Sequence, residues 1–529
     1  MVQPGFSVAL AAGSGLPMPG GGPFAAAIRW KPFGTAARAT LRAGRQPVPL
    51  ALLAVLLALP AVVVGESKLA AESAPPTSRV QIKLSVRGEL FAPTGTNAPP
   101  VREPITLEAG FDFLEAGDNA AVTRHYREAS AAVTIRERIE RTSLASDARD
   151  VEFTLVGTTP TPQLADGFLS RQEAELLDIP FDPLLLDQLL PATEQAGADS
   201  WKVPGDVVAG LLSIDTVTGG GIDVAVEHGT DGTKTLRLTG TVHGAVDGAV
   251  TRIDVTGVAR LAGNADNPVA LVVSDKARGR IEGIEVTLAE RREAGWLAPG
   301  LDVEAALVIT RSAPLADAAA AADDAASEPG VPLADPAAGR PRGAGRPGTV
   351  WHRHPHGRYT LVLDRRWRVV EDGPEGLVMR LADHGALVAQ CSIMPLPRSA
   401  PDAAPTPRQV SRDVEQSLAG QFGHLAAAEE TTRDDGTRVV RVVAEGSAEG
   451  RPFRWIHHLL ADPAGYRAAV TCMLEPALAD RFGGADHELV AGIVLLADPT
   501  RPQPAAAGGQ PVARQAQLPE NPGAARASP

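Results

Sequence analysis

The sequence is poor in cysteine, in aromatic residues and in catalytic signatures. Only two of its 529 residues are cysteines, Cys391 and Cys472, and aromatic residues make up 4%. It contains no C-x-x-C spacing, no G-x-S-x-G nucleophile elbow and no complete phosphate-binding loop. The scarcity of aromatic residues also argues against stacking platforms and sugar-binding strips. We therefore predict a non-enzymatic protein without a cofactor.

Positive charge is scarce in the larger part of the chain. The net charge is −13, and residues 1–65 contribute five basic residues and no acid, which leaves −18 for residues 66–529. Binding to nucleic acid requires clustered lysine and arginine side chains that neutralise phosphates. The charge balance therefore predicts that nucleic acid is not a partner.

One long apolar run is present, Val48–Gly65, and it follows a basic segment. Its eighteen uncharged residues are close to the minimum length for a transmembrane helix. The basic residues before it favour a cytoplasmic N-terminus, which places the bulk of the chain outside the cytoplasm. Pro49 and Pro60 shorten the uninterrupted apolar core, and a short core is also typical of a cleaved signal peptide. Both alternatives, a single-pass membrane anchor and a secretory signal, deliver the rest of the chain to the same side.

Composition separates ordered from disordered parts. The segments 313–348 and 499–529 consist mainly of Ala, Pro, Gly and charged residues. They cannot bury enough apolar surface to offset the entropy lost on ordering. The predicted parts are a disordered basic tail (1–46), a transmembrane helix or signal segment (47–65), a mostly-β extracytoplasmic domain (77–312), a disordered linker (313–348), a second domain (349–498) and a disordered tail (499–529).

The domain at 77–312 shows the alternation that is typical of half-buried strands. From Val80 to Val86 every second residue is apolar, and the same period recurs up to Ile309. Turn signals between these runs favour an antiparallel meander. The leucines between 170 and 215 favour short helices instead. We predict a curved antiparallel sheet or half-barrel with a helical insertion that plugs its concave side.

The domain at 349–498 shows both helix and strand signals. Thr406 begins a predicted helix whose apolar residues recur every four positions up to Phe422. Strand-like runs follow between 438 and 474. The fold class predicted for the whole chain is therefore α+β.

Two resemblances accompany these patterns. Leu184–Pro191, Ala198–Trp201 and Ala298–Asp302 resemble a recurring pattern in exported bacterial proteins of unknown function. That resemblance covers most of 80–312 and implies no particular activity.

The second resemblance concerns the C-terminal domain. Tyr359–Leu363 and the following Arg366-Trp367 resemble the opening of the PsbP-like family, and the order of elements over 350–498 is similar to that family. The resemblance implies an α/β/α sandwich with a binding or accessory role outside the cytoplasm.

His352, His354 and His356 form the candidate metal site. Alternate residues of an extended segment share one side, so the three imidazoles could converge on a transition metal. No fourth ligand can be identified, and a solvated linker junction is the alternative interpretation.

Cys391 and Cys472 form the candidate disulfide. Each lies in an apolar, strand-like run. In an oxidising compartment such a pair can form a bridge, and otherwise both thiols would behave as small buried hydrophobes. The sequence leaves both alternatives open.

The function predicted from the sequence is binding or scaffolding in a bacterial envelope, for an unknown protein partner or hydrophobic ligand. A first alternative is a carrier that holds a lipid or another hydrophobic ligand in the sheet of residues 77–312. Further alternatives are an uncharacterised hydrolase and a metal-handling protein. The deciding observation is whether the concave side of the sheet is a filled core or contains a cavity.

Overall fold

The computed structural model describes residues 77–92, 101–191, 198–229, 234–262, 281–295, 299–312, 340–343, 345–383, 386–400 and 405–497. The predicted tails at 1–46 and 499–529 and the segment Val48–Gly65 lie outside these residues, as does most of the predicted linker at 313–348. Within the described part of the chain, no helix combines the length and the apolar character needed to cross a membrane.

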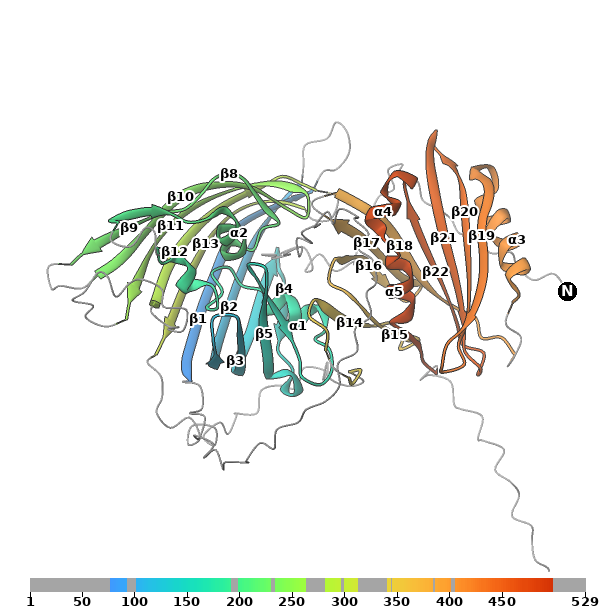
Figure 1. Cartoon of the computed structure of the whole chain (residues 1–529), viewed down its shortest axis with the longest axis horizontal. Helices are drawn as coiled ribbons and strands as arrows, with labels where there is room; N and C mark the ends of the chain where they lie inside the picture. Colours follow the sequence, from blue (N-terminus) through green and yellow to red (C-terminus); the bar gives the residue numbers. More distant parts are fainter. Residues whose placement is uncertain are drawn as a thin grey trace, which may run out of the picture.

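The first region is one curved antiparallel sheet of thirteen strands (Figure 1). The strand order is β6-β5-β3-β2-β1-β13-β12-β11-β10-β9-β7, with β4 paired to β3 and β8 paired to β10. The first strand, β1, therefore pairs with the last, β13, in the middle of an open sheet whose edges are β6 and β7. The strands are β1 (Ser78–Ala92), β2 (Val101–Gly117), β3 (Ala121–Ile135), β4 (Arg138–Ser143), β5 (Asp150–Val156), β6 (Thr159–Gln163), β7 (Ser200–Lys202), β8 (Thr216–Gly220), β9 (Asp223–His228), β10 (Lys234–Val246), β11 (Ala249–Leu261), β12 (Ile281–Arg292) and β13 (Gly300–Arg311).

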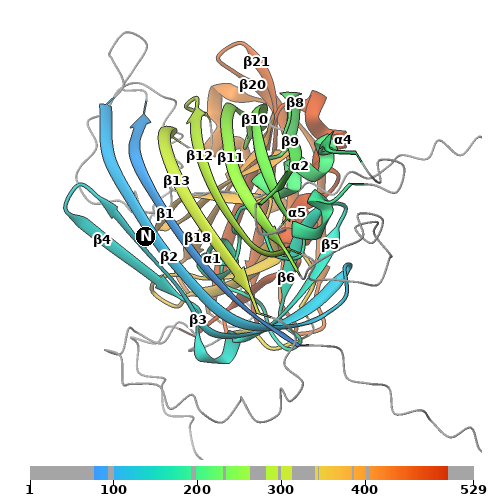
Figure 2. The same cartoon turned by 90° about the vertical axis from the view of Figure 1, so that its left-hand side faces the viewer.

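The sheet forms because each strand carries apolar side chains on one face. Val80, Ile82 and Leu84 of β1 are at most 5% exposed, whereas the residues between them face solvent. Ile309 and Leu307 of β13 lie directly opposite Ile82 and Leu84, so apolar side chains meet across the strands. Figure 2 shows the strong curvature of these strands.

The segment between β6 and β8 fills much of the concave side of the sheet, and we call residues 164–191 and 203–215 the plug (Figure 1). It contains α1 (Arg171–Leu176), the 3-10 turn η3 (Leu186–Leu189) and α2 (Gly205–Leu212), while the short turn η2 (Ser146–Ala148) precedes β5. The plug packs tightly against the turn between β5 and β6, because a Cβ added at Gly210 would lie 2.2 Å from the carbonyl oxygen of Thr158. Its buried leucines are Leu164, Leu169, Leu176, Leu177, Leu184, Leu185, Leu186, Leu189, Leu190, Leu211 and Leu212.

A buried ion network joins the plug to the sheet. The guanidinium group of Arg124 on β3 is fully buried, and it donates to Glu115 at 2.8 Å and to Asp182 of the plug at 2.6 Å. It also lies over the ring of Phe153, 4.0 Å from the ring centroid. Arg311 of β13 donates to the carbonyl oxygen of Pro183 at 2.7 Å. The plug is therefore held to the sheet by charge as well as by apolar contact.

The second region contains a seven-stranded antiparallel sheet, in the order β16-β17-β18-β22-β21-β20-β19, and a small sheet in the order β14-β15-β23. Its strands are β14 (Thr349–Arg353), β15 (Tyr359–Asp364), β16 (Trp367–Gly373), β17 (Gly376–Asp383), β18 (Ala386–Leu396), β19 (Phe422–Thr432), β20 (Arg438–Ala448), β21 (Arg451–Ala461), β22 (Arg467–Leu474) and β23 (Ile493–Leu495). Its helices and 3-10 turns are α3 (Pro407–Leu418), η7 (Ala419–Gln421), η8 (Pro476–Leu478), α4 (Ala479–Phe482) and α5 (Ala485–Ala491).

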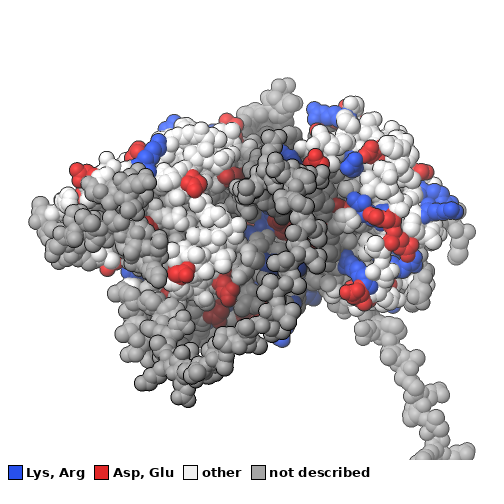
Figure 3. All heavy atoms as spheres, viewed as in Figure 1, with Lys and Arg blue, Asp and Glu red and all other residues white. Residues whose placement is uncertain are grey.

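Both faces of the seven-stranded sheet are covered. Thr406 caps α3, and Val410, Val414 and Leu418 of this helix pack on one face around Trp455. The short helices α4 and α5 cover part of the other face, where their apolar residues join the main core. The surface seen in Figure 3 carries acidic and basic side chains next to one another on this region, where ion pairs connect neighbouring strands.

The two regions share one continuous apolar core and several ion pairs. Arg365 binds Asp178 of the plug at 2.9 Å, and Arg368 binds Asp247 in the β10–β11 turn at 3.0 Å. The main chain of Trp351 in β14 donates to Leu169 of the plug at 3.0 Å. The two regions are therefore packed against each other.

The predicted α+β class is wrong. Strand accounts for 61% of the described residues and helix for 14%, so the fold is mainly antiparallel β. The leucine-rich part of the plug forms helices of only six and eight residues, and turns hold the leucines between them. In the second region, expected as an α/β/α sandwich, α3 is the one described helix longer than eight residues. Leucine spacing misled the prediction, because a turned segment inside a core buries leucines as a helix does.

The ion network yields a stability prediction. Arg124→Met keeps an unbranched side chain but removes the guanidinium group, and it leaves the carboxylates of Glu115 and Asp182 buried without their main counter-charge. We expect the free energy of unfolding to fall by about 3–5 kcal/mol, measured by urea denaturation.

The matched control is Arg102→Met. Its ion pair with Glu89 on the neighbouring strand has side chains that are 54% and 49% exposed. Exposed pairs contribute less than about 1 kcal/mol, so this variant should lose little stability. Similar losses in the two variants would show that the buried network is not a major stabilising interaction.

Candidate ligand-binding site

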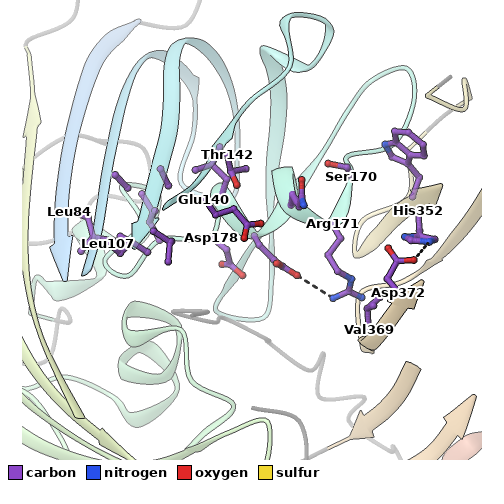
Figure 4. Close-up of a pocket in the computed structure, with 18 of the residues that line it drawn as sticks. Leu84, Leu107, Glu140, Thr142, Ser170, Arg171, Asp178, His352, Val369 and Asp372 are labelled. Atoms are coloured by element: carbon purple, nitrogen blue, oxygen red, sulfur yellow. Dashed lines mark hydrogen bonds and ion pairs between the residues drawn. The ribbon is translucent and has the colours of Figure 1, made fainter. Parts of the chain in front are cut away.

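The plug does not cover the whole concave face of the sheet. Beside α1, the inward faces of β1–β4 border a pocket of about 400 Å³ (Figure 4). Ala109, Ala131 and Val133 are only partly buried there, although they lie on the face that is elsewhere closed. The opposite wall of the pocket comes from β14 and β16 of the second region. The pocket therefore lies where the sheet, the plug and the second region meet.

The floor of the pocket is apolar and its walls are polar. In Figure 4, Leu84 and Leu107 lie on one side, His352 and Asp372 on the other, and Glu140 between them. The apolar lining comprises Leu84, Leu107, Ala109, Phe111, Ala131, Val133, Leu176, Ile179, Trp351, Val369 and Val370, and the polar lining comprises Glu140, Thr142, Ser170, Arg171, Gln172, Glu175, Asp178, His352, Arg353 and Asp372.

The wall formed by α1 is positioned by a capping box. The Ser170 hydroxyl accepts from the main chain of Glu173 at 3.2 Å, and the Glu173 carboxylate accepts from the main chain of Ser170 at 2.7 Å. Arg340 then binds the same carboxylate at 2.8 Å. This arrangement fixes the first turn of α1, from which Arg171 projects to pair with Glu175 at 3.3 Å and to donate to the carbonyl oxygen of Trp367.

The wall formed by the second region carries two titratable groups with opposite shifts. Burial lowers the pKa of His352 to about 4, with the nearby Arg171 adding to the effect. Burial raises the pKa of Asp372 to about 6. The Nε2 atom of His352 lies 3.7 Å from the Asp372 carboxylate, which is too far for a hydrogen bond. At neutral pH the imidazole is therefore uncharged and the carboxylate is ionised.

Three buried polar atoms of the pocket residues have no hydrogen-bond partner among the described residues. They are Oε2 of Glu140, Nε1 of Trp351 and Nε2 of His352. Leaving a buried polar group unpaired costs about 1–3 kcal/mol. A pocket that combines an apolar floor with unpaired acceptors and donors is suited to a ligand with an apolar body and a polar head.

Comparisons with known proteins provide only a partial guide. No family model and no curated protein matches the chain. PsbP from the cyanobacterium Synechocystis sp. PCC 6803 is similar at 12% identity over 28% of this chain and 93% of its own, with a TM-score of 0.23. Lipovitellin matches at 9% identity over 46% of this chain and 26% of its own, with a TM-score of 0.25. A Pseudomonas aeruginosa protein of unknown function matches at 16% identity over 29% of this chain and 99% of its own, with a TM-score of 0.19.

These TM-scores are too low to support an argument about function. The resemblance to PsbP is supported in part, because a PsbP structure is found although no family model matches.

The structure does not bring the three predicted metal ligands together as a site. His352 faces the pocket, whereas His354 is 1% exposed and its Nδ1 atom accepts from the main chain of His356 at 3.2 Å. Within the described residues, no group of three or more His, Cys, Asp or Glu side chains is placed to hold a metal ion. The metal hypothesis therefore gains no support from this geometry.

Cys391 and Cys472 are direct partners across β18 and β22, and both are fully buried. Both thiols are free in this structure, and burial together with the neighbouring thiol raises the pKa of Cys391. The sequence identified the two residues but could not show that they face each other. Their disulfide remains a prediction.

One buried histidine–carboxylate pair lies away from the pocket. Nε2 of His458 is 2.9 Å from Asp486, and Arg441 binds the same carboxylate at 2.9 Å. Both His458 and Asp486 are at most 2% exposed. The pair is therefore enclosed in the core between β21 and α5, and in this structure it is not open to a substrate.

Sequence reasoning missed most of the pocket. Glu140 belongs to a stretch of alternating charge, residues 136–141, which is typical of a solvated surface, and Asp372 carries no sequence signal. His352 was identified, although for a different role. The one readable signature was Ser170 to Glu173, whose S-x-x-E pattern predicts a helix start.

His352 yields a prediction about acid stability. Its pKa is about 4 in the folded protein and 6.5 in the unfolded chain, so folding is favoured by this group above pH 6.5 and loses that contribution as the pH falls towards 4. When the pH falls from 7 to 5, the free energy of unfolding should decrease in both proteins. We expect this decrease to be about 1–2 kcal/mol smaller in His352→Gln than in the wild type, measured by urea denaturation.

Several other groups titrate in this range, including His354 and His458, whose pKa burial also lowers. His457, whose pKa burial also lowers to about 4, acts in the same direction, and Asp372 acts in the opposite direction. Since these groups are present in both the variant and the wild type, the difference between the two stability losses is assigned to His352. Parallel losses in the two proteins would show that its imidazole is not desolvated as described.

Proposed function

We propose that this protein binds a small amphiphilic ligand, without transforming it, in the pocket between the sheet and the second region. The observation that carries the proposal is the pocket of about 400 Å³ with its apolar floor and polar walls. Both the size and the lining are typical of small-molecule sites. If Val48–Gly65 exports the chain, this binding activity belongs to the cell envelope.

The filled core supports a small ligand over a long lipid chain. Leu185, Leu186 and Leu189 of the plug are fully buried against the sheet, in the place where a half-barrel carrier would hold an acyl chain. Within the sheet the remaining space borders β1–β4, and α1, β14 and β16 limit it on the other sides. The hydrophobic-carrier alternative therefore survives in a restricted form, as a pocket for one compact molecule.

The polar walls support an amphiphile over a simple hydrocarbon. Glu140 and Trp351 present a buried acceptor and a buried donor without partners among the described residues. A ligand that pairs with them removes a desolvation cost that a hydrocarbon would leave in place. The proposed ligand accordingly has polar groups at one end and an apolar body against Leu84 and Leu107.

The proposal predicts that the protein binds an apolar dye in the pocket. Titration of the full chain with Nile red should give a saturable increase in fluorescence. Ala131→Phe places a ring in the pocket, because Ala131 lies on its floor, and it should weaken dye binding by about tenfold.

The control is Thr134→Phe. Thr134 follows Val133 on β3 and points to the opposite, convex face of the sheet, because neighbours in a strand alternate. It does not border the pocket, so its variant should bind the dye as the wild type does. The proposal fails if neither variant affects binding, or if Thr134→Phe alone abolishes it.

A further inference from the structure

The carboxylates that line the pocket outnumber the cations that neutralise them. Glu140, Glu175, Asp178 and Asp372 all border the pocket. Arginines hold two of them, because Arg171 pairs with Glu175 and Arg365 pairs with Asp178. The other two, Glu140 and Asp372, have no ion pair with a lysine or arginine within the described residues.

Glu140 is the more informative of these two acids. It lies on β4 opposite Val133, so its carboxylate emerges beside the apolar floor. Its Oε2 atom is buried and unpartnered among the described residues. A buried carboxylate oxygen without a donor is costly, and a cationic donor compensates it better than a neutral one does.

Asp372 adds a second negative charge on the opposite wall. His352 lies 3.7 Å from this carboxylate, and burial keeps its imidazole uncharged at neutral pH. The Asp372 side chain is 32% exposed, so a ligand that enters the pocket can reach it. Acidic groups therefore stand on two sides of the same apolar floor.

The basic side chains of the pocket are poorly placed to attract an anion. The guanidinium group of Arg171 is engaged by Glu175 and by the carbonyl oxygen of Trp367. Arg353 also borders the pocket but is exposed, so solvent and salt screen its charge. A carboxylate or phosphate ligand would meet Glu140 and Asp372 without a dedicated partner.

We infer that the ligand is an organic amine, bound as its ammonium ion, with an aliphatic or aromatic body on the apolar floor. The ammonium group carries up to three donors, and it compensates the charge of Glu140 and is attracted by Asp372. This inference rests on the proposed binding function and specifies the chemical class of its ligand.

The experiment compares three ligands of equal chain length: octylamine, octanol and octanoate. Each displaces Nile red from the full chain at neutral pH, and each dissociation constant is measured. Octylamine should bind about tenfold or more tightly than octanol, and octanoate should bind most weakly. In Glu140→Gln the preference for octylamine over octanol should largely disappear, while octanol binds as before.

Two further variants control the result. Glu137→Gln removes the same charge in the turn before β4, at an exposed residue outside the pocket, and should leave the preference intact. Asp372→Asn should reduce the preference by a smaller factor than Glu140→Gln, because Asp372 is the more exposed acid. Octanol binding in every variant reports that the pocket is still folded.

The possible failures are distinguishable. If octanol binds as tightly as octylamine, or if Glu140→Gln leaves the preference unchanged, the inference about amines is wrong while the binding function stands. If octanoate binds best, the inference is also wrong. If none of the three ligands displaces the dye and no dye binds, both the binding function and the amine inference are overturned.

Discussion

The buried ion network around Arg124 determines where the plug lies, and the pocket depends on that placement. Glu115 and Asp182 come from the sheet and from the plug, and one guanidinium group satisfies both of them in the core. Since an unpaired charge there is strongly unfavourable, the network allows few positions of the plug. With the plug held against β3, its leucines fill one part of the concave side, and the beginning of α1 borders the part that remains open.

The sheet could be predicted from the sequence because its signal is local. Alternation from Val80 to Val86 contains the information for one strand, and each further strand repeats it. The plug was misjudged because its conformation depends on contacts between distant residues. Arg124 and Asp182 are 58 positions apart, and no spacing rule connects them. The leucines of the plug therefore indicated correctly that this segment is buried. Its secondary structure depends on the ion network and on the turns.

The pocket was harder to predict for the same reason. Glu140 and His352 come from strands in different regions, and only the packing of those regions places them around one space. Catalytic and metal sites often have recognisable sequence motifs. A pocket for an amphiphile needs only apolar residues and a few polar ones, and every sheet contains both. The sequence could identify His352 as a candidate functional residue. It could not show that His352 lies in the wall of a pocket.

The pocket has walls from both regions, and this has a thermodynamic consequence. A ligand that contacts β2 and β14 together binds only when the two regions are docked, so its binding free energy is added to the docking equilibrium. At a hundred times its dissociation constant such a ligand contributes about 2.7 kcal/mol to the docked state. Ligand binding in this pocket would therefore stabilise the docked arrangement of the two regions and make the whole chain more rigid. A third molecule that contacts both regions would then bind differently in the presence of the ligand.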